Sequence, residues 1–342
     1  MSAPLAVKDQ SATYALLDLI QGSVITQGIY VAAKLGIADV LGEGPLTVEE
    51  IAKRVDANPD ATYRLLRMLS GYSIFSEQAD GRFGLTPMAD ALRDGAPDSM
   101  RAIAVLMGHP LLWEDWGHLL SSVHSGEASL PELRGMNGYE FLMANPEYAA
   151  VFFQGMGSIS SAETESLLAA YDFSQYREIV DFGGGRGTLL AAILKQASGS
   201  HGILYDSPYS TADADPLMAE AGVASRCTIQ NGGIFDSPPA GADAYVLKHI
   251  VHDFPESECL TVLKNIRSVI HPGGKLLVME YVLSGDNERH IGNVIDLWLL
   301  LLLGARERTR QQYSELFARA GFKLTAVVST SSPISIVEAV PD

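Results

Sequence analysis

The stretch DFGGGRGTLL, residues 181–190, decides the fold of the second half of the chain. Three glycines in a row are uncommon inside a helix or a strand, because glycine loses more conformational freedom on folding than any other residue. The apolar segment EIVDF leads into these glycines as a strand, and TLLAAILKQA continues from them as a helix. A strand, a glycine loop and a helix in this order predict the ligand-binding turn of a doubly wound α/β sheet.

Short apolar runs alternate with helical segments from Glu178 onward. EIVDF is followed by GILYD, CTIQ, AYVLKH and KLLVMEYVL, and then by FKLTAVV and ISIVEAV near the end of the chain. Strands separated by helices predict a parallel sheet with helices on both faces. Only STSSP separates the last two runs, which is too short for a crossover helix, so they predict an antiparallel hairpin at the sheet edge. We therefore predict a seven-stranded, doubly wound, Rossmann-like sheet with an antiparallel last strand, in a domain over residues 171–342.

The first 160 residues are predicted to be almost entirely helical, because apolar residues recur there at helical spacing. Residues 44–94 form a compact exception: a helix capped by Thr47 with Glu50 three residues on, a second helix after Pro59, and two short strands around ADG. This is the order of a winged helix. Acidic residues outnumber basic ones in it by eight to six, whereas DNA-binding modules are basic. We interpret residues 1–100 as a dimerisation or lid module, with DNA binding as the less favoured alternative.

Length and charge limit the classes of partner. The chain has 342 residues, which suggests two domains, and a formal net charge of −17. Binding to nucleic acid or to an anionic membrane relies on Lys and Arg neutralising phosphate, so neither partner is expected. The two cysteines, Cys227 and Cys259, are too few for a disulfide framework, and the N-terminus lacks a secretory pattern, so we expect a cytoplasmic protein. The run LWLLLLL, residues 297–303, is too short to span a membrane and predicts a buried helix.

The glycine spacing restricts the ligand. The glycines read Gly183-x-Gly185-x-Gly187, and Thr188 stands where a dinucleotide-binding G-x-G-x-x-G would have its third glycine. A loop without side chains lets a compact, partly charged group lie against the backbone, and Asp206 at the end of GILYD is placed to accept from ribose hydroxyls. S-adenosylmethionine, a nucleoside without a diphosphate, meets both conditions. The alternative, that the glycines only turn a strand into a helix, leaves this acid at the second strand end unexplained.

Six segments together resemble a known enzyme family. VDFGGGRGTLL, YDSP, GGIF, LKHIVHDF, HPGGKLLVMEYVL and GARERT occur in the order and at the separations typical of small-molecule O-methyltransferases of the caffeate and bacterial polyketide-tailoring type. The resemblance covers essentially the whole chain. It implies class I, S-adenosylmethionine-dependent methyl transfer, an N-terminal half that forms an intertwined homodimer, and linking helices at residues 101–170 that roof the substrate pocket.

The resemblance also assigns a cofactor site, in which two positions depart from the family pattern. The expected contacts are Gly183 and Gly185 with the methionine part, Asp206 with the ribose, Gly233, Ile234 and Phe235 around the adenine, and Lys248 at the cofactor's edge. Gly233 stands where relatives commonly have aspartate, which removes a carboxylate expected near the adenine amino group. Phe254 replaces the usual tryptophan, which keeps an aromatic face but loses an indole donor.

Methyl transfer to oxygen benefits from a base, because a phenol with a pKa of about 10 is mostly protonated at neutral pH. The resemblance selects His252 in LKHIVHDF as the general base, and we interpret His249 as structural. A carboxylate on the other ring nitrogen would fix the tautomer and stabilise the imidazolium. Glu280 and Glu307 both match family positions that flank the base, and a surface salt bridge is the alternative for each. No Cys or further His stands nearby in sequence to complete a coordination shell, so we predict no metal.

The acceptor pocket is expected to be apolar. It would be built by FFQGM, residues 152–156, and by the leucine-rich helix near residue 298, most of whose leucines we interpret as core. Met156, Asn293 and Trp298 are the predicted substrate contacts, and they imply a flat acceptor such as a phenol, quinol or polyketide. Three alternative functions remain. The same scaffold could carry carbon or nitrogen methylation, hydroxylation or pericyclic chemistry. The protein could instead be a ligand-sensing DNA-binding regulator, or an NAD-dependent oxidoreductase, which the glycine spacing disfavours.

Overall fold

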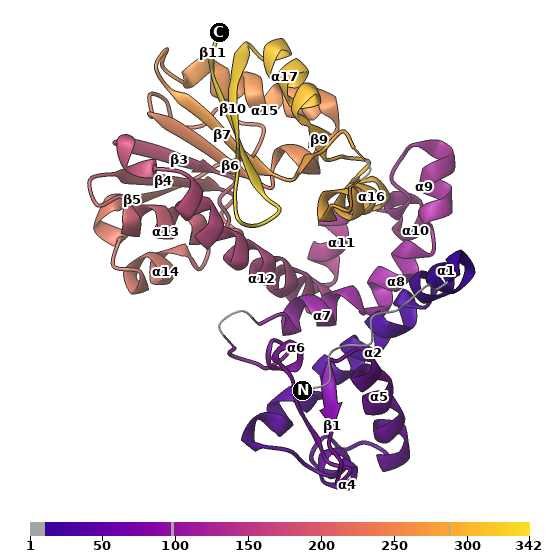
Figure 1. The fold of residues 1–342 in the computed structure, drawn as a ribbon. Helices are drawn as coiled ribbons and strands as arrows, with labels where there is room; N and C mark the ends of the chain where they lie inside the picture. Colours follow the sequence, from indigo (N-terminus) through magenta and orange to yellow (C-terminus); the bar gives the residue numbers. More distant parts are fainter. Residues whose placement is uncertain (1–10, 97–98, 287) are drawn as a thin grey trace. The chain divides into compact units, whose positions relative to one another are not determined.

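The computed structural model describes residues 11–96, 99–286 and 288–342, which form two compact units (Figure 1). Unit 1 comprises the described residues up to Glu114 together with Asn145–Ile159, and unit 2 comprises Asp115–Ala144 and Ser160–Asp342. The long helix α12 (Pro146–Ala170) contributes to both units. The segment at 101–170 that we expected to link two domains is therefore shared between them. Residues 1–10 of the expected N-terminal domain lie outside the described residues.

Unit 1 contains the winged-helix elements that the sequence predicts. Thr47 caps α4 (Val48–Arg54) in a capping box with Glu50, and Asn58 caps α5 (Pro59–Gly71). The two short strands β1 (Phe75–Glu77) and β2 (Phe83–Leu85) pair antiparallel. The other helices are α1 (Ala12–Ile20), α2 (Gly22–Leu35), α3 (Ile37–Val40), α6 (Pro87–Asp90), α7 (Arg101–Met107) and α8 (Pro110–Trp116), the last of which ends in unit 2.

Helix α1 is apolar but buries none of its residues. Leu19 is 77% exposed and Ile20 is 64% exposed, whereas the core of unit 1 is built from later residues such as Ile51, Leu66 and Phe83. Within the described part of the chain, the stretch Ala12–Leu35 is long and apolar enough to cross a membrane by length and composition, and 11% of its most apolar window is buried. Those two properties do not separate a membrane span from a helix that packs against protein.

Unit 2 is built on the predicted seven-stranded sheet. Its strands are β3 (Glu178–Phe182), β4 (His201–Asp206), β5 (Cys227–Asn231), β6 (Ala244–Lys248), β7 (Lys275–Glu280), β10 (Phe322–Ser329) and β11 (Ser335–Pro341). They lie in the order β10-β11-β7-β6-β3-β4-β5 (Figure 1). Strands β3 to β7 are parallel, and β11 runs antiparallel to both β7 and β10. The predicted fold and the hairpin at the sheet edge are confirmed.

Strand residues alternate between two cores, one on each face of the sheet. Val180 and Phe182 point toward the core that holds α15 (Glu256–Val269) and α17 (Arg310–Arg319). Ile179, which precedes Val180 and lies on the opposite face of the strand, points toward the core of α13 (Thr188–Gln196) and α14 (Ala214–Glu220). Both faces are covered, which is why the strands read as nearly continuous apolar runs. The remaining helices of unit 2 are α9 (Leu119–Ser125), α10 (Leu130–Arg134), α11 (Gly138–Ala144) and α16 (Ile291–Leu303).

Two local expectations need correction. KLLVMEYVL is not one strand: β7 ends at Glu280, and the short β8 (Val282–Leu283) pairs instead with β9 (Arg308–Thr309) in a separate parallel ladder. The leucine-rich run forms α16, but this helix is not fully buried. Leu299 and Leu301 are buried, whereas Leu297 is 42% exposed. Among the described residues, α16 packs against α9, α10 and β8, and these neighbours leave Leu297 uncovered.

Candidate active site

The candidate site lies at the carboxyl edge of the sheet. The glycine loop follows β3, Asp206 is the last residue of β4, Lys248 is the last residue of β6, and Glu280 is the last residue of β7. Because these four strands are parallel, their carboxyl ends meet at one edge. This is the edge at which doubly wound sheets bind ligands, next to the point where the strand order reverses between β3 and β6.

The glycine loop leaves open space beside its backbone. Gly183 and Gly185 have φ angles of 76° and 58°, in the left-handed region that favours glycine. A Cβ at Gly183 would lie 2.4 Å from Ile250, whereas one at Gly185 would meet no heavy atom within 4 Å. Asp206 fastens this loop, because its Oδ2 accepts the N–H of Gly185 at 2.8 Å. The backbone at Gly185 is therefore free for close approach by a ligand, as expected for the cofactor site.

Asp181 was not singled out from the sequence, yet it lies beneath this loop. It is buried, and its Oδ2 has no hydrogen-bond partner among the described residues. A Cβ at Gly184 would lie 2.5 Å from that oxygen. Burial, together with the charge of Asp206, raises the pKa of Asp181 to about 7. A buried acceptor without a partner beside this loop lacks a hydrogen-bond donor that the described residues do not supply, and the ammonium of S-adenosylmethionine is such a donor. The available signal was an acid inside an otherwise apolar strand.

The carboxylate of Asp236 lies beside Gly233. Asp236 accepts the N–H of Gly233 at 2.8 Å, and a Cβ at Gly233 would lie 2.9 Å from Oδ2 of Asp236. A carboxylate thus occupies the space that a side chain at position 233 would fill. Phe235 is 43% exposed, and its ring packs edge-on against Phe254 at 5.3 Å. The side chain of Ile234 lies near Gly183, where a Cβ would be 3.4 Å from it. These residues offer the predicted adenine site an exposed aromatic edge and a nearby carboxylate.

Lys248 is engaged within the protein. Its ammonium donates to the carbonyl and the hydroxyl of Ser160, at 2.9 and 2.7 Å, and lies 3.0 Å from Oε2 of Glu163. Burial lowers the pKa of Lys248. Ser160 and Glu163 both belong to α12, so the end of β6 is fastened to that helix. The sequence contained no local signal for Glu163, which lies in an unremarkable helical segment 85 positions before Lys248.

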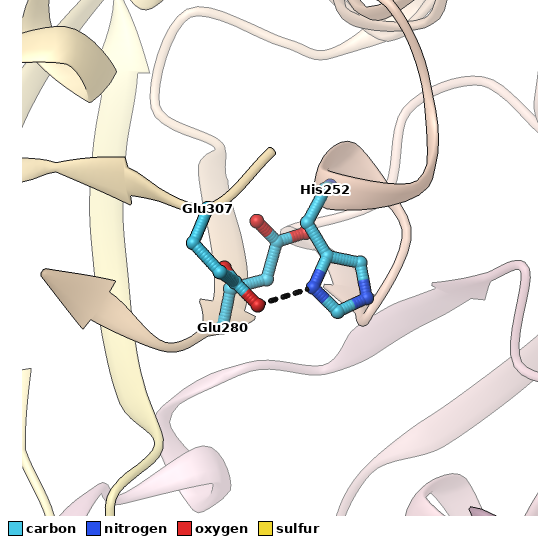
Figure 2. A group of neighbouring side chains, drawn as sticks. All are labelled: His252, Glu280 and Glu307. Carbon is cyan, nitrogen blue, oxygen red and sulfur yellow. Dashed lines mark hydrogen bonds and ion pairs between the residues drawn. The ribbon is translucent and has the colours of Figure 1, made fainter. Parts of the chain in front are cut away.

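His252, Glu280 and Glu307 come together in a buried group (Figure 2). Nδ1 of His252 lies 2.7 Å from Oε1 of Glu307. Glu280 contacts the backbone of His252 rather than its ring, because its Oε1 accepts the His252 N–H at 3.0 Å. The turn after β7 and the pairing of β8 with β9 bring Glu307 beside the imidazole. Glu307 is therefore the carboxylate on the ring nitrogen, and the surface salt-bridge alternative is wrong for both acids, since both are buried.

The charges around His252 favour its protonated form. Burial alone disfavours an imidazolium, but the carboxylates of Asp253, Glu307 and Glu280 outweigh it and raise the pKa of His252 to about 10. Oδ1 of Asp253 lies 3.4 Å from Nε2, the nitrogen opposite Glu307. Tyr139 of α11 donates to Oδ2 of Asp253 at 3.1 Å. The imidazole is thus held between two carboxylates, one at each ring nitrogen.

His252, Glu280 and Glu307 also satisfy a geometric test for metal ligands, since one donor atom from each lies within 4.8 Å of the others. Most of their donor atoms have partners inside the protein, and the exception is Oε2 of Glu307, which is buried without a hydrogen-bond partner among the described residues. Glu280 accepts from the His252 backbone and from the hydroxyl of Tyr313, and Glu307 accepts from the imidazole. We describe the group as a hydrogen-bonded network for this reason.

The predicted substrate contacts lie in different units. Met156 belongs to the part of α12 in unit 1 and is half-buried. Asn293 and Trp298 belong to α16 in unit 2, where Asn293 is exposed and Trp298 is buried. Each keeps its status as a prediction.

Known proteins match both units. The O-methyltransferase domain family matches residues 116–323, and the O-methyltransferase dimerisation domain matches residues 17–94. The phenazine O-methyltransferase PhzM of Lysobacter antibioticus is 39% identical over 95% of each chain. The 8-amino-8-demethylriboflavin N,N-dimethyltransferase of Streptomyces davaonensis is 32% identical over 91% of this chain and 90% of its own length. The structure of the O-methyltransferase NcsB1 from neocarzinostatin biosynthesis, solved with S-adenosylmethionine and 2-hydroxy-5-methyl naphthoic acid, has a TM-score of 0.81 at 30% identity, covering 98% of this chain and all of that one.

The fold and the site define an S-adenosylmethionine-dependent methyltransferase. The chain belongs to the O-methyltransferase family that carries this dimerisation domain. The residues fit the cofactor: an open glycine backbone, an acid at the end of β4, a buried acceptor without a partner, and an exposed aromatic edge.

Proposed function

We propose that the enzyme methylates a hydroxyl group on a small aromatic natural product, with His252 as the general base. The observation that carries this proposal is the buried His252–Glu307 pair at the edge of the sheet that holds the glycine loop. A base with a carboxylate on its other nitrogen is suited to deprotonating an acceptor. An amine acceptor, which needs no deprotonated oxygen, is the alternative that the riboflavin dimethyltransferase relative suggests.

The proton balance supports an oxygen acceptor. An ordinary histidine with a pKa of about 6.5 would take the proton of a phenol of pKa about 10 at a cost of about 5 kcal/mol. The raised pKa of His252, about 10, matches that of the phenol, so the transfer itself is nearly balanced once His252 has released its own proton to solvent, which becomes easier as the pH rises toward 10. The proton of the hydroxyl passes to Nε2, Nδ1–H stays bonded to Glu307, and Asp253 stabilises the imidazolium. When bound, S-adenosylmethionine supplies the methyl group from its sulfonium. His252 then releases its proton to solvent.

The experiment is methyl transfer from labelled S-adenosylmethionine to a panel of phenols, quinols, polyketides and aryl amines, followed by mass spectrometry. We expect O-methyl products. His252→Ala should lower kcat by about 10²–10⁴ while cofactor affinity stays nearly unchanged. Electron-poor phenols, which ionise without help, should recover much of the loss. Methylated amines as the only products, or a wild-type rate for His252→Ala across the pH range, would sink the proposal.

We also propose that the active form is a cytoplasmic homodimer that binds neither DNA nor membranes. The exposed apolar face of α1 and the dimerisation-domain match support pairing through unit 1, which would cover that face. Light scattering should give a dimer, and removing residues 1–40 should cause aggregation or loss of activity. A soluble, active monomer after this truncation would contradict the proposal. Mobility-shift and vesicle-sedimentation assays should both be negative.

A further inference from the structure

A second histidine–glutamate pair lies against the first. His249 follows β6 directly, and its Nε2 lies 2.8 Å from Oε2 of Glu163. Its ring stacks on the ring of His252, with centroids 4.9 Å apart and planes inclined by 23°. The arrangement is therefore a carboxylate, an imidazole, a second imidazole and a second carboxylate in succession. From the sequence alone we interpreted His249 as structural, and the proposed mechanism leaves both His249 and Glu163 without a role.

Glu163 is buried and receives three donors. Besides His249, the hydroxyl of Tyr281 donates to its Oε1 at 2.5 Å, and the Lys248 ammonium lies 3.0 Å from Oε2. Burial favours the protonated carboxyl of Glu163, whereas the hydrogen bonds from His249 and Tyr281 and the charge of Lys248 lower its pKa. Glu163 is thus an ionised acceptor at any working pH. A carboxylate can only accept, so Nε2 of His249 must carry a proton.

The tautomer of His249 follows from its other nitrogen. Nδ1 is buried and has no hydrogen-bond partner among the described residues. A proton there would be a buried donor without an acceptor, which is unfavourable. The Lys248 ammonium already balances the charge of Glu163. The geometry therefore favours a neutral His249 ring with its proton on Nε2, and it excludes His249 as the base, since one nitrogen is engaged and the other is inaccessible.

The backbone conformation of His249 is one that few residue types adopt. Its φ angle is 55°, and only two other described non-glycine residues, Asp56 and Ser73, have a positive φ. A non-glycine residue in this region is strained and keeps this conformation only where its surroundings hold it there. The hydrogen bond with Glu163 and the ring contacts with His252 and with Tyr281, whose centroid lies 5.4 Å away, hold it.

We propose that Glu163 and His249 are positioning residues for His252: Glu163 fixes His249 in one tautomer and orientation, and the face of the neutral His249 ring supports the protonated form of His252. The inference rests on the proposed role of His252 as the base. A neutral aromatic face attracts an adjacent cation, more strongly when water is excluded. The other titratable and charged groups around His252 are Asp253 on its own turn, Glu280 on β7, Glu307 before β9, and the buried Arg308 of β9, which donates to the carbonyl of Val251. Tyr139 of α11, Tyr313 of α17 and Asp296 of α16 contact Asp253, Glu280 and Glu307 respectively.

The test compares four variants with an acceptor no more acidic than an ordinary phenol. His249→Asn removes the ring while keeping a residue that tolerates positive φ. Glu163→Leu removes the acceptor of Nε2–H, and Glu163→Gln keeps an acceptor oxygen. Glu165→Gln, exposed on the same helix, is the matched control. His249→Asn and Glu163→Leu should lower kcat by about 3- to 30-fold and move the acidic limb of the pH–kcat profile to lower pH. Glu163→Gln should recover most of the rate, and Glu165→Gln should match wild type.

A second measurement does not depend on activity or on the acceptor. Nitrogen NMR of selectively labelled histidine side chains should show His249 as the Nε2–H tautomer in the wild type and in Glu163→Gln. In Glu163→Leu the tautomers should mix. An Nδ1–H tautomer in the wild type would overturn the inference.

The outcomes separate the two proposals. A lower kcat in His249→Asn with an unmoved acidic limb would mean that His249 only maintains structure, and a wild-type profile would mean that it has no role. Either result overturns the inference while His252 remains the base. A wild-type rate in His252→Ala instead overturns the proposed function, and the inference fails with it.

Discussion

Nδ1 of His252 lies 2.7 Å from a carboxylate oxygen of Glu307, whereas Glu280, equally buried, accepts from the backbone N–H of His252 and not from its ring. The two acids therefore have different effects. Glu307 acts on the ring that changes charge, and Glu280 fastens the turn that carries the ring, with help from Tyr313.

Glu307→Gln keeps the shape and an acceptor for Nδ1–H but removes the charge. A charge-assisted hydrogen bond is worth about 1.5–3 kcal/mol, so kcat should fall by about 10- to 150-fold. The imidazolium loses a stabilising charge, so the acidic limb of the pH–kcat profile should move to lower pH. Glu280→Gln should instead lower the melting temperature and move that limb less. Steady-state kinetics over a pH series and calorimetry test both, and equal effects of the two changes on the limb would contradict the assignment.

The pKa of His252, raised to about 10, sets the expected pH dependence of the wild-type enzyme. Base catalysis requires that one proton has already left, either from His252 or from the acceptor hydroxyl. Activity therefore rises with pH through the lower of their two pKa values. With an acceptor of ordinary phenol acidity, kcat should therefore still be rising well above pH 6.5. Measurements from pH 6 to 10 with constant ionic strength test this. A plateau reached by pH 7 would show that His252 behaves as an unperturbed histidine.

The parts of the site that were predictable are those encoded locally. EIVDF and the glycines that follow it specify a strand, a loop and a helix within a few residues, and the fold follows from repeating that alternation. The choice between Glu280 and Glu307 depends on where β7 ends and on which strand β8 pairs with. Both candidates satisfy the sequence pattern, and only the tertiary geometry separates them.

Glu163 could not be predicted from the sequence. It lies in a helical segment, SSAETES, where an acid is normally solvated, and Glu165 two residues later is indeed exposed. Its burial depends on Lys248, His249 and Tyr281, all more than 80 positions away in the sequence. Long-range charge pairing of this kind leaves no local pattern. The partial exposure of α16 was missed for a related reason, because composition alone does not say how many sides of a helix are covered.

Asp181 should make stability depend on pH in an unusual direction. The pKa of Asp181 is raised to about 7, so the folded state binds this proton more tightly than the unfolded state does. The free energy of unfolding therefore falls as the pH rises from about 4 through 7. Asp181→Asn, which is isosteric and neutral, should raise the melting temperature at pH 8, by the equivalent of about 1–4 kcal/mol, and should have little effect at pH 4. Scanning calorimetry without cofactor tests this. A destabilised Asn variant at pH 8 would mean that the carboxylate is stabilised in the fold.

Asp206 has two functions that substitutions can separate. Its Oδ2 fastens the glycine loop through the N–H of Gly185, and the family resemblance assigns its carboxylate to the ribose. Asp206→Asn keeps an oxygen for Gly185 but loses the charge, whereas Asp206→Ala loses both. We expect Asp206→Ala to weaken the binding of S-adenosylmethionine by about 1.5–3 kcal/mol and Asp206→Asn to weaken it by less, with the fold intact in both.

Gly185→Val should weaken binding more than either, because φ is 58° there and the side chain would fill the open space beside the loop. Titration calorimetry gives the three affinities, with Gly199→Val as a control, since Gly199 also has open space around it but lacks a positive φ and lies at the opposite edge of the sheet, before β4. Unchanged affinity in Asp206→Ala would remove this residue from the cofactor site.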